Sequence, residues 1–204
     1  MSPVLVTGLV TRRERSVSVR LKTEGETQME TGTVPDITMI GDRLAIQEVL
    51  AKHSRGVDRA DETVLKSCYW PDSTVAYGGF NGNAHEFCTY LPNGIKRYYA
   101  TQHTITNVLA DIRGNRAQVE TYVTAYHYRR EEDGTGTEMT YLGRYLDRFE
   151  KRGNVWKIRH RQVLMDWNQN TTASSINQGP PFDGLARGTR YPEDPMYAML
   201  AEKV

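Results

Sequence analysis

The chain contains the stretches QHTITNVLADI at residues 102–112, RAQVETYVTAYHYRR at 116–130, MTYLGRYLDRFEK at 139–151 and WKIRHRQVLMDW at 156–167. All four are rich in β-branched and aromatic residues, a composition typical of strands. The connections between them are short and polar and contain glycine, as hairpin loops do. The sequence therefore predicts a meander of four antiparallel strands.

The segment before the meander has the periodicity of a helix. Asp42 is a candidate N-cap, and an apolar face follows it at helical spacing. That face consists of Leu44, Ile46, Val49, Leu50, His53 and Val57. Asp61 is a candidate N-cap for a second, short helix, which Pro71 would stop.

Shorter elements connect these helices to the meander. We expect a strand at 73–77, a glycine-rich turn at 78–82, and helical turns at 84–90 and within 94–99. Helices that precede a series of long hairpins are typical of an α+β fold. The expected fold class is therefore α+β, with one largely antiparallel sheet.

The composition restricts the class of protein. The chain has 204 residues, a net charge of +1, 38% apolar residues and 25% charged residues, which suits one packed domain. A balanced charge argues against nucleic acid or an anionic membrane surface as the main partner. No apolar run approaches the ~20 residues of a membrane-spanning helix. Cys68 and Cys88 show neither metal spacing nor a disulfide framework, which favours a reducing, cytoplasmic setting.

The domain has expected boundaries within the chain. Residues 1–37 mix charges with Thr, Ser and Gly and predict a loosely ordered extension. The α+β domain is expected at 38–168. Residues 169–204 form a tail rich in Gly, Pro and Asn that ends in an apolar cluster at 196–200. This cluster is expected to cover either a pocket mouth or a neighbouring subunit.

Asp58 and His103 are the candidate catalytic pair. Asp58 follows the apolar helix at its C-terminal end, where the helix dipole disfavours a carboxylate, so a cationic partner is expected. His103 lies on the first strand of the meander and is the candidate partner. An imidazole oriented by a carboxylate can abstract a proton at neutral pH. The alternatives are a local Asx-type bond for Asp58 and a packed core histidine for His103.

Two further residues are candidates for the same site. His53 lies on the apolar helix face and either donates to a leaving oxygen or is simply packed. Arg161 shares its strand parity with inward Val163 and Met165 but also with Lys157 and Arg159, which should be solvated. Either a bulge near it or the emergence of the strand into the pocket is therefore expected. Arg161 either stabilises an anion in the pocket or is a surface charge.

The chain resembles the SnoaL-like domains of the nuclear-transport-factor-2-like superfamily. The resemblance lies in Asp42–Gln47, Gly56-Val57-Asp58, Cys68–Asp72, His103-x-x-x-Asn107 and the pair Tyr145–Glu150 and Trp156-Lys157-Ile158, over roughly residues 40 to 168. It implies a cone-shaped, curved antiparallel or mixed sheet wrapped around N-terminal helices, with a deep apolar pocket. It further implies no cofactor, and a homo-oligomer, most often a trimer.

The resemblance also assigns site residues. Asp58 matches the family's pocket aspartate, His103 its catalytic histidine, and Arg161 the arginine that a dehydrochlorinase of the family uses. His53 stands where a relative has a pocket tyrosine, which is a departure. Residues implied or predicted to bind substrate are Asn107, Tyr141, Tyr145, Val163 and Met165. No metal-site motif appears among the remaining histidines.

The expected function is that of a cofactor-independent lyase of the dehydratase type, acting on a hydrophobic steroid-like or aromatic small molecule. One alternative is an isomerase or an aldehyde-releasing lyase that uses the same dyad. A second is a non-catalytic module, either a ligand-binding domain or a subunit like the small subunit of an oxygenase, because one fold can host many functions.

Overall fold

The computed structural model describes residues 32–132, 135–173, 179–180 and 182–202. The chain divides into two units, Met1–Val34 and Pro35–Val204, and all elements named below belong to the second. Most of the predicted N-terminal extension, residues 1–31, lies outside the described residues. None of the described helices is long and apolar enough to cross a membrane.

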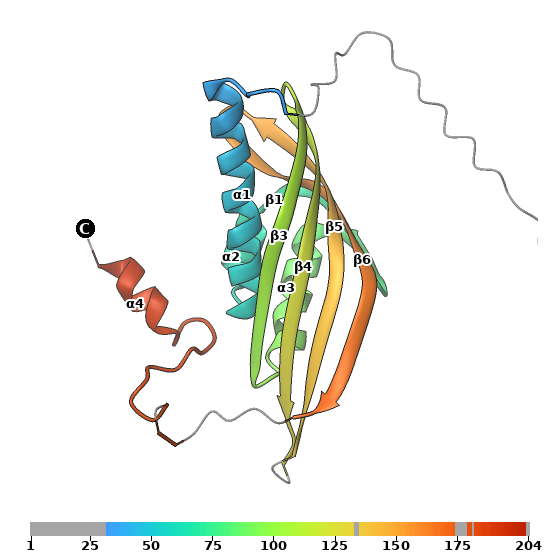
Figure 1. Ribbon diagram of the computed structural model, residues 1–204. Helices are drawn as coiled ribbons and strands as arrows, with labels where there is room; N and C mark the ends of the chain where they lie inside the picture. Colours follow the sequence, from blue (N-terminus) through green and yellow to red (C-terminus); the bar gives the residue numbers. More distant parts are fainter. Residues whose placement is uncertain (1–31, 133–134, 174–178, 181, 203–204) are drawn as a thin grey trace, which may run out of the picture. The chain divides into compact units, whose positions relative to one another are not determined.

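The second unit is an α+β domain with one mixed, six-stranded sheet (Figure 1). The helices are α1 (Ile37–Asp58), α2 (Glu62–Ser67), α3 (Ala84–Ile95) and α4 (Pro195–Ala201), and the strands are β1 (Tyr69–Tyr77), β2 (Phe80–Asn83), β3 (Ala100–Arg113), β4 (Arg116–Arg130), β5 (Gly136–Arg152) and β6 (Val155–Thr172). The strand order is β2-β1-β6-β5-β4-β3. The expected fold class and the antiparallel meander β3-β4-β5-β6 are confirmed.

Helix α1 begins earlier than the sequence predicted. Asp36, and not Asp42, is the N-cap, and its side chain accepts a hydrogen bond from the Met39 backbone N–H at 2.8 Å. Asp42 lies within the helix and accepts hydrogen bonds from Trp156 Nε1 at 2.7 Å and Lys151 Nζ at 2.8 Å. The prediction was wrong because Asp42 serves a tertiary contact with the β5–β6 hairpin, which its local sequence does not reveal. Asp61 does cap α2, as expected.

Strand β1 also departs from the prediction, since it starts at Tyr69 and includes Pro71. It pairs in parallel with β6 at Tyr69↔Ile158 and again at Thr74↔His160, so the intervening residues of β1 bulge out of register. Proline is tolerated there because a bulged residue needs no ladder hydrogen bond. The turn expected at 78–82 is a two-residue loop, Gly78-Gly79, followed by strand β2.

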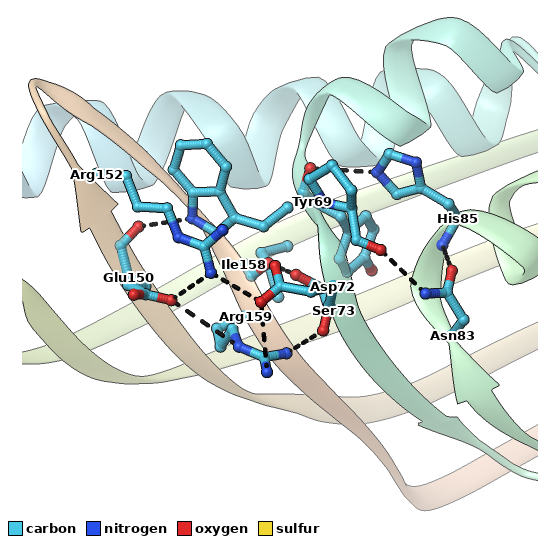
Figure 2. A network of polar contacts seen from close by, with 11 residues as sticks. Tyr69, Asp72, Ser73, Asn83, His85, Glu150, Arg152, Ile158 and Arg159 are labelled. Carbon is cyan, nitrogen blue, oxygen red and sulfur yellow. Dashed lines mark hydrogen bonds and ion pairs between the residues drawn. The ribbon is translucent and has the colours of Figure 1, made fainter.

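A charged network holds this irregular junction together. Arg152 contacts the carboxylates of Asp72 and Glu150, and Arg159 donates to the Asp72 carbonyl (Figure 2). The buried Ser73 hydroxyl donates to the Ile158 carbonyl at 2.7 Å in the same view. The bulge therefore keeps its polar groups paired although the ladder is interrupted.

The core lies between the helices and the inner face of the sheet, with α1 alongside β3 (Figure 1). Its fully buried side chains include Ile46, Leu50, Leu65, Tyr69, Val75, Phe149 and Ile158. Strand β3 bends at Asn107, whose φ of 47° is left-handed, where two residues of β3 face one of β4. Asparagine tolerates this conformation better than most residues.

Two glycines offer a matched stability test. A Cβ at Gly143 of β5 would overlap the Leu164 carbonyl and the Tyr141 hydroxyl, whereas a Cβ at Gly41 of α1 would meet nothing. Gly143→Ala should lower the free energy of unfolding by about 2 kcal/mol or more through overpacking. Gly41→Ala should raise it by about 0.5–1 kcal/mol through helix propensity. Urea unfolding of both variants checks this, and a shift of the same sign in both would contradict it.

Candidate active site

The structure brings Asp58 and His103 into direct contact. The His103 ring Nδ1–H donates to Asp58 Oδ1 at 2.7 Å, and the His103 backbone N–H donates to Asp58 Oδ2 at 2.9 Å. The His103 side chain is 5% exposed and the Asp58 side chain 10%. Because an ionised carboxylate only accepts, the proton of the neutral ring sits on Nδ1. Nε2 is then left with a free lone pair.

Asp58 is the last residue of α1, and the C-terminal segment completes its surroundings. Arg190 donates to the Asp58 carbonyl oxygen, to Thr101 Oγ1 at 3.0 Å and to the Tyr98 carbonyl at 2.9 Å. A guanidinium at this place satisfies a carbonyl that the helix leaves unpaired and offsets the negative pole of its dipole. No sequence pattern pointed to Arg190, since its contacts span 89 residues or more along the chain.

The His103 side of the Asp58–His103 pair lies on the wall of a cavity. The cavity has a volume of about 240 Å³. Its lining comes from α3, β1, β3, β4 and β5 and from the α3–β3 connection, and consists of Tyr77, Tyr90, Leu91, Gly94, Ile95, Arg97, Tyr98, His103, Ala125, His127, Met139, Tyr141 and Tyr145. Asp58 is not in this set, so it acts from behind the imidazole. The abundance of tyrosine gives the wall both apolar area and hydroxyl groups.

His127 is a cavity residue that sequence reasoning missed. Its ring lies edge-on to that of His103, with centroids 5.3 Å apart, and 4.8 Å from the ring of Tyr98. Burial, with the nearby His103, lowers the pKa of His127 to about 4, so the ring is neutral at pH 7. Its Nδ1 is buried without a hydrogen-bond partner in the described part of the chain. The sequence signal that could have revealed His127 is the alternation of β4, which places this residue on the inward face.

His53 lies deeper, in a buried polar network. Arg161 Nη1 donates to His53 Nδ1 at 3.0 Å, so the His53 proton sits on Nε2 and is donated to the Tyr69 hydroxyl at 3.0 Å. Burial first, and then the charge of Arg161, hold the pKa of His53 well below its usual range. His53 does not line the cavity, and its one N–H already has an acceptor.

Arg161 is buried, with 2% of its surface exposed, which excludes the surface-charge alternative. Its Nε and Nη2 donate to the two carboxylate oxygens of Asp147, each at 2.7 Å. The expected bulge is confirmed, because Ile158↔Phe149 and His160↔Arg148 leave Arg159 unmatched on β6. Arg161 does not line the cavity, but its guanidinium lies 4.0 Å from the ring centre of Tyr145, which does.

The five predicted substrate-binding residues divide into two groups. Tyr141 and Tyr145 line the cavity. Asn107, Val163 and Met165 do not: Asn107 is exposed at the β3 bulge, Val163 packs beneath Tyr145, and Met165 is 66% exposed. Strand parity fails at Asn107 because the β3 bulge begins there. Val163 and Met165 keep the regular register of Arg161 but lie outside the lining of the cavity.

Burial also acts on the cavity tyrosines. It raises the pKa of Tyr141 to about 12, and it raises the pKa of Tyr145 further although the charge of Arg161 opposes the rise. Both hydroxyls therefore remain protonated and can donate hydrogen bonds. The Tyr141 hydroxyl donates to the Leu164 carbonyl. Among the described residues, no three His, Cys, Asp or Glu side chains are grouped so as to hold a metal ion.

A family model for the SnoaL-like domain matches residues 38–162. The chain belongs to the SnoaL-like domain family. Its match ends within β6, so the C-terminal segment with Arg190 lies outside the family domain. The resemblance inferred from the sequence is thereby confirmed.

Solved structures share the fold of this SnoaL-like domain. A hexachlorocyclohexane dehydrochlorinase, LinA-type3 from Novosphingobium barchaimii LL02, is 22% identical with a TM-score of 0.60, over 72% of this chain and 100% of that one. A proposed scytalone dehydratase from Novosphingobium aromaticivorans DSM 12444 is 21% identical with a TM-score of 0.59, over 74% of this chain and 98% of that one. The comparison with curated proteins finds no match.

The neutral buried histidines make stability depend on pH. The pKa of His127 is about 4 in the folded state and near 6.5 in the unfolded state, so the unfolded chain binds the extra proton between these values. Stability should therefore be full above pH 6.5 and fall as the pH approaches 4. In His127→Phe the slope of unfolding free energy against pH should be smaller by up to about 1.4 kcal/mol per pH unit.

Urea unfolding of both proteins at pH 5.0, 5.5, 6.0 and 7.5 measures this slope. The difference in unfolding free energy between the two proteins at pH 7.5 gives the effect of the changed packing, because His127 is neutral at that pH in both the folded and the unfolded state. Parallel slopes for the parent and His127→Phe would contradict the assignment of His127 as a neutral, buried ring.

Proposed function

We propose that this SnoaL-like domain is a cofactor-independent lyase of the dehydratase type. The observation that carries the proposal is the Asp58–His103 hydrogen bond of 2.7 Å, with the His103 ring on the cavity wall. Asp58 fixes the tautomer, so the basic Nε2 is available to a substrate in the cavity. The same carboxylate offsets the positive charge that the ring acquires when it takes a proton.

In the proposed reaction, His103 Nε2 removes a proton from a carbon next to a carbonyl group. The electron pair of the broken C–H bond forms the C=C bond, and the C–O bond to the neighbouring hydroxyl group breaks. The departing hydroxide takes a proton and leaves as water. A base that the fold holds within reach of the substrate suits the first step.

Tyr145 is the proposed proton donor to the leaving oxygen, in place of His53. Tyr145 lines the cavity and His53 does not. The Arg161 guanidinium under the Tyr145 ring stabilises the negative charge that its oxygen gains as the proton leaves. Arg161 is then a positioning residue that acts through Tyr145 and holds His53 in the neutral form. His127 adds a ring that is neutral at pH 7 to the wall of the cavity beside His103.

The cavity favours a hydrophobic substrate with an aromatic or fused-ring body. Five of the cavity's wall residues are tyrosines, and Leu91, Ile95 and Met139 add apolar surface. Aromatic walls with a few polar groups bind flat apolar ligands and orient them through hydrogen bonds. We therefore propose hydroxy ketones of aromatic or steroid-like type as the substrate class.

The compound 4-hydroxy-4-phenylbutan-2-one tests the reaction type with one molecule. Elimination gives 4-phenylbut-3-en-2-one and water, whereas cleavage releases benzaldehyde and acetone, so mass spectrometry separates the two. The parent should form the enone. His103→Ala should lower kcat about 10²–10⁴-fold because the base is lost. Asp58→Asn should lower kcat with a smaller change in KM, because it disturbs the tautomer of His103 and leaves the wall of the cavity unchanged.

His53→Phe and Tyr145→Phe separate the two possible proton donors. We expect a larger loss of kcat in Tyr145→Phe, measured against the circular dichroism and melting temperature of each variant. Release of benzaldehyde would favour an aldehyde-releasing lyase. Equal behaviour of His103→Ala and the parent toward this compound and its steroid-like analogues would refute the dyad and favour a binding module.

We also propose that the protein is a homo-oligomer, most simply a trimer, assembled through the outer face of the sheet. Tyr122 of β4, Leu146 of β5 and Trp167 of β6 are 41%, 36% and 55% exposed. Tyr122 and Leu146 each alternate with buried residues and so point away from the core. The same face carries Glu120, Arg144 and Asp166, and such a mixture of exposed apolar and charged side chains is what subunit interfaces present. The two cysteines are free and buried, which supports a reducing compartment such as the cytoplasm.

Light scattering coupled to size-exclusion chromatography tests the assembly. The parent should elute with three times the 23.2 kDa mass of the chain. Leu146→Glu should shift it toward the monomer, because burying an unpaired carboxylate in the interface is unfavourable. Lys52→Glu, on an exposed position of α1, is the matched control and should leave the mass unchanged. A monomeric parent would overturn the proposal.

A further inference from the structure

A second, larger hollow lies beside the first cavity and is built partly by the C-terminal segment. We call it the basic groove. Its volume is about 590 Å³. It is lined by Arg59, Lys96, Tyr98, Tyr99, Ala100, Thr101, Tyr126, Tyr128, Arg187, Gly188, Thr189 and Arg190. One wall, residues 187–190, lies beyond the part of the chain that matches the family model.

The groove has a strongly one-sided charge. Four of its lining residues are Arg or Lys, and no lining residue is Asp or Glu. Two of these cations are occupied: Arg59 Nη1 lies 2.8 Å from Asp194 Oδ2, and Arg190 donates to Asp58, Thr101 and Tyr98. They fix the C-terminal segment in place. An uncompensated basic hollow attracts anions.

The other two cations are exposed and available. Within the described residues no carboxylate pairs with Lys96 or Arg187, and Arg187 donates only to the Phe182 carbonyl. Lys96 follows the end of α3, while Arg187 belongs to the C-terminal segment, so the two approach the groove from separate elements. Two cations without a carboxylate partner that line the same hollow attract an anionic group to it.

Tyrosines form the remainder of the groove. Tyr99 and Tyr128 pack edge to face with their ring centres 5.5 Å apart, and the Tyr126 hydroxyl donates to Glu138 at 3.0 Å. Such rings offer a flat organic body apolar area beside the cations. Tyr98 lines both the groove and the cavity that holds His103. The groove is therefore a neighbour of the candidate active site.

We propose that the basic groove binds the anionic head of a small aromatic or fused-ring organic acid, such as a carboxylate or sulfonate, through Lys96 and Arg187. The head belongs either to the substrate whose body occupies the cavity or to a separate anion. The version in which the substrate carries the anionic head rests on the proposed function. The groove as a site for a separate anion does not rest on it.

Two fluorescent probes that differ by one charge test the groove. 8-Anilinonaphthalene-1-sulfonate carries a sulfonate, and N-phenyl-1-naphthylamine has the same aromatic body without it. The parent should bind the sulfonate probe more tightly, and sodium chloride should weaken that binding. In Lys96→Gln/Arg187→Gln the Kd for the sulfonate should rise about tenfold, because two charges near the anion are lost, while the Kd for the neutral amine should not change.

Lys52→Gln/Arg116→Gln is the control, since it removes two exposed cations that line neither hollow. Equal sulfonate affinity in the groove variant and this control overturns the proposal. An equal loss for the neutral amine overturns it as well. Melting temperatures show that both variants are folded.

Addition of 4-phenylbut-3-en-2-one, a neutral enone of cavity size, distinguishes the two sources of the anion. Competitive displacement of the sulfonate probe supports a head carried by the substrate. Simultaneous binding of both compounds overturns that form and supports a separate anion. His103→Ala keeps the groove intact, so a lost reaction with retained probe binding separates the failure of the dyad from the failure of the groove.

Discussion

Both N–H groups of His103 are held by one carboxylate, and the candidate site depends on this contact. Asp58 accepts the ring Nδ1–H with one oxygen and the backbone N–H with the other. The two bonds fix the end of α1 against β3 and also fix the orientation of the imidazole. A carboxylate at a helix C-terminus is unfavourable by itself, and the structure offsets it with His103 and with Arg190 on the last carbonyl.

His103 and His53 have opposite surroundings, and this difference divides their roles. His103 has a carboxylate on one nitrogen and lies on the wall of the cavity. His53 has an arginine on one nitrogen and a tyrosine on the other, so its hydrogen-bonding capacity is used inside the core. A proton-accepting histidine needs a carboxylate beside it, as His103 has, because a nearby cation such as Arg161 disfavours protonation. The buried Arg161–Asp147 pair thus keeps His53 neutral and supports Tyr145 from below.

Long periodic elements and pairs of chemically complementary residues could be predicted from the sequence, while features set by tertiary contacts could not. The meander, the cap at Asp61 and the bulge near Arg161 follow from local patterns. The displaced N-cap does not, because the contacts of Asp42 with Lys151 and Trp156 of the β5–β6 hairpin decide it.

The site shows the same division. The contact of Asp58 with His103 was inferred from chemistry and resemblance. His127 was missed although the alternation of β4 places it on the inward face. Arg190 could not be singled out, because a tail arginine carries no local signal. They matter only through the side chains that folding places around them.

The C-terminal segment links the site to the part of the chain that lies outside the family domain. Arg59–Asp194 and the Tyr197–Asp61 hydrogen bond of 2.7 Å attach this segment to the loop between α1 and α2, next to the residue that orients His103. The family domain ends within β6, so this wall is not part of what the chain shares with the family model. A fold that holds its candidate dyad inside the domain and builds a neighbouring wall from a separate segment places ligand contacts and chemistry on different parts of the chain.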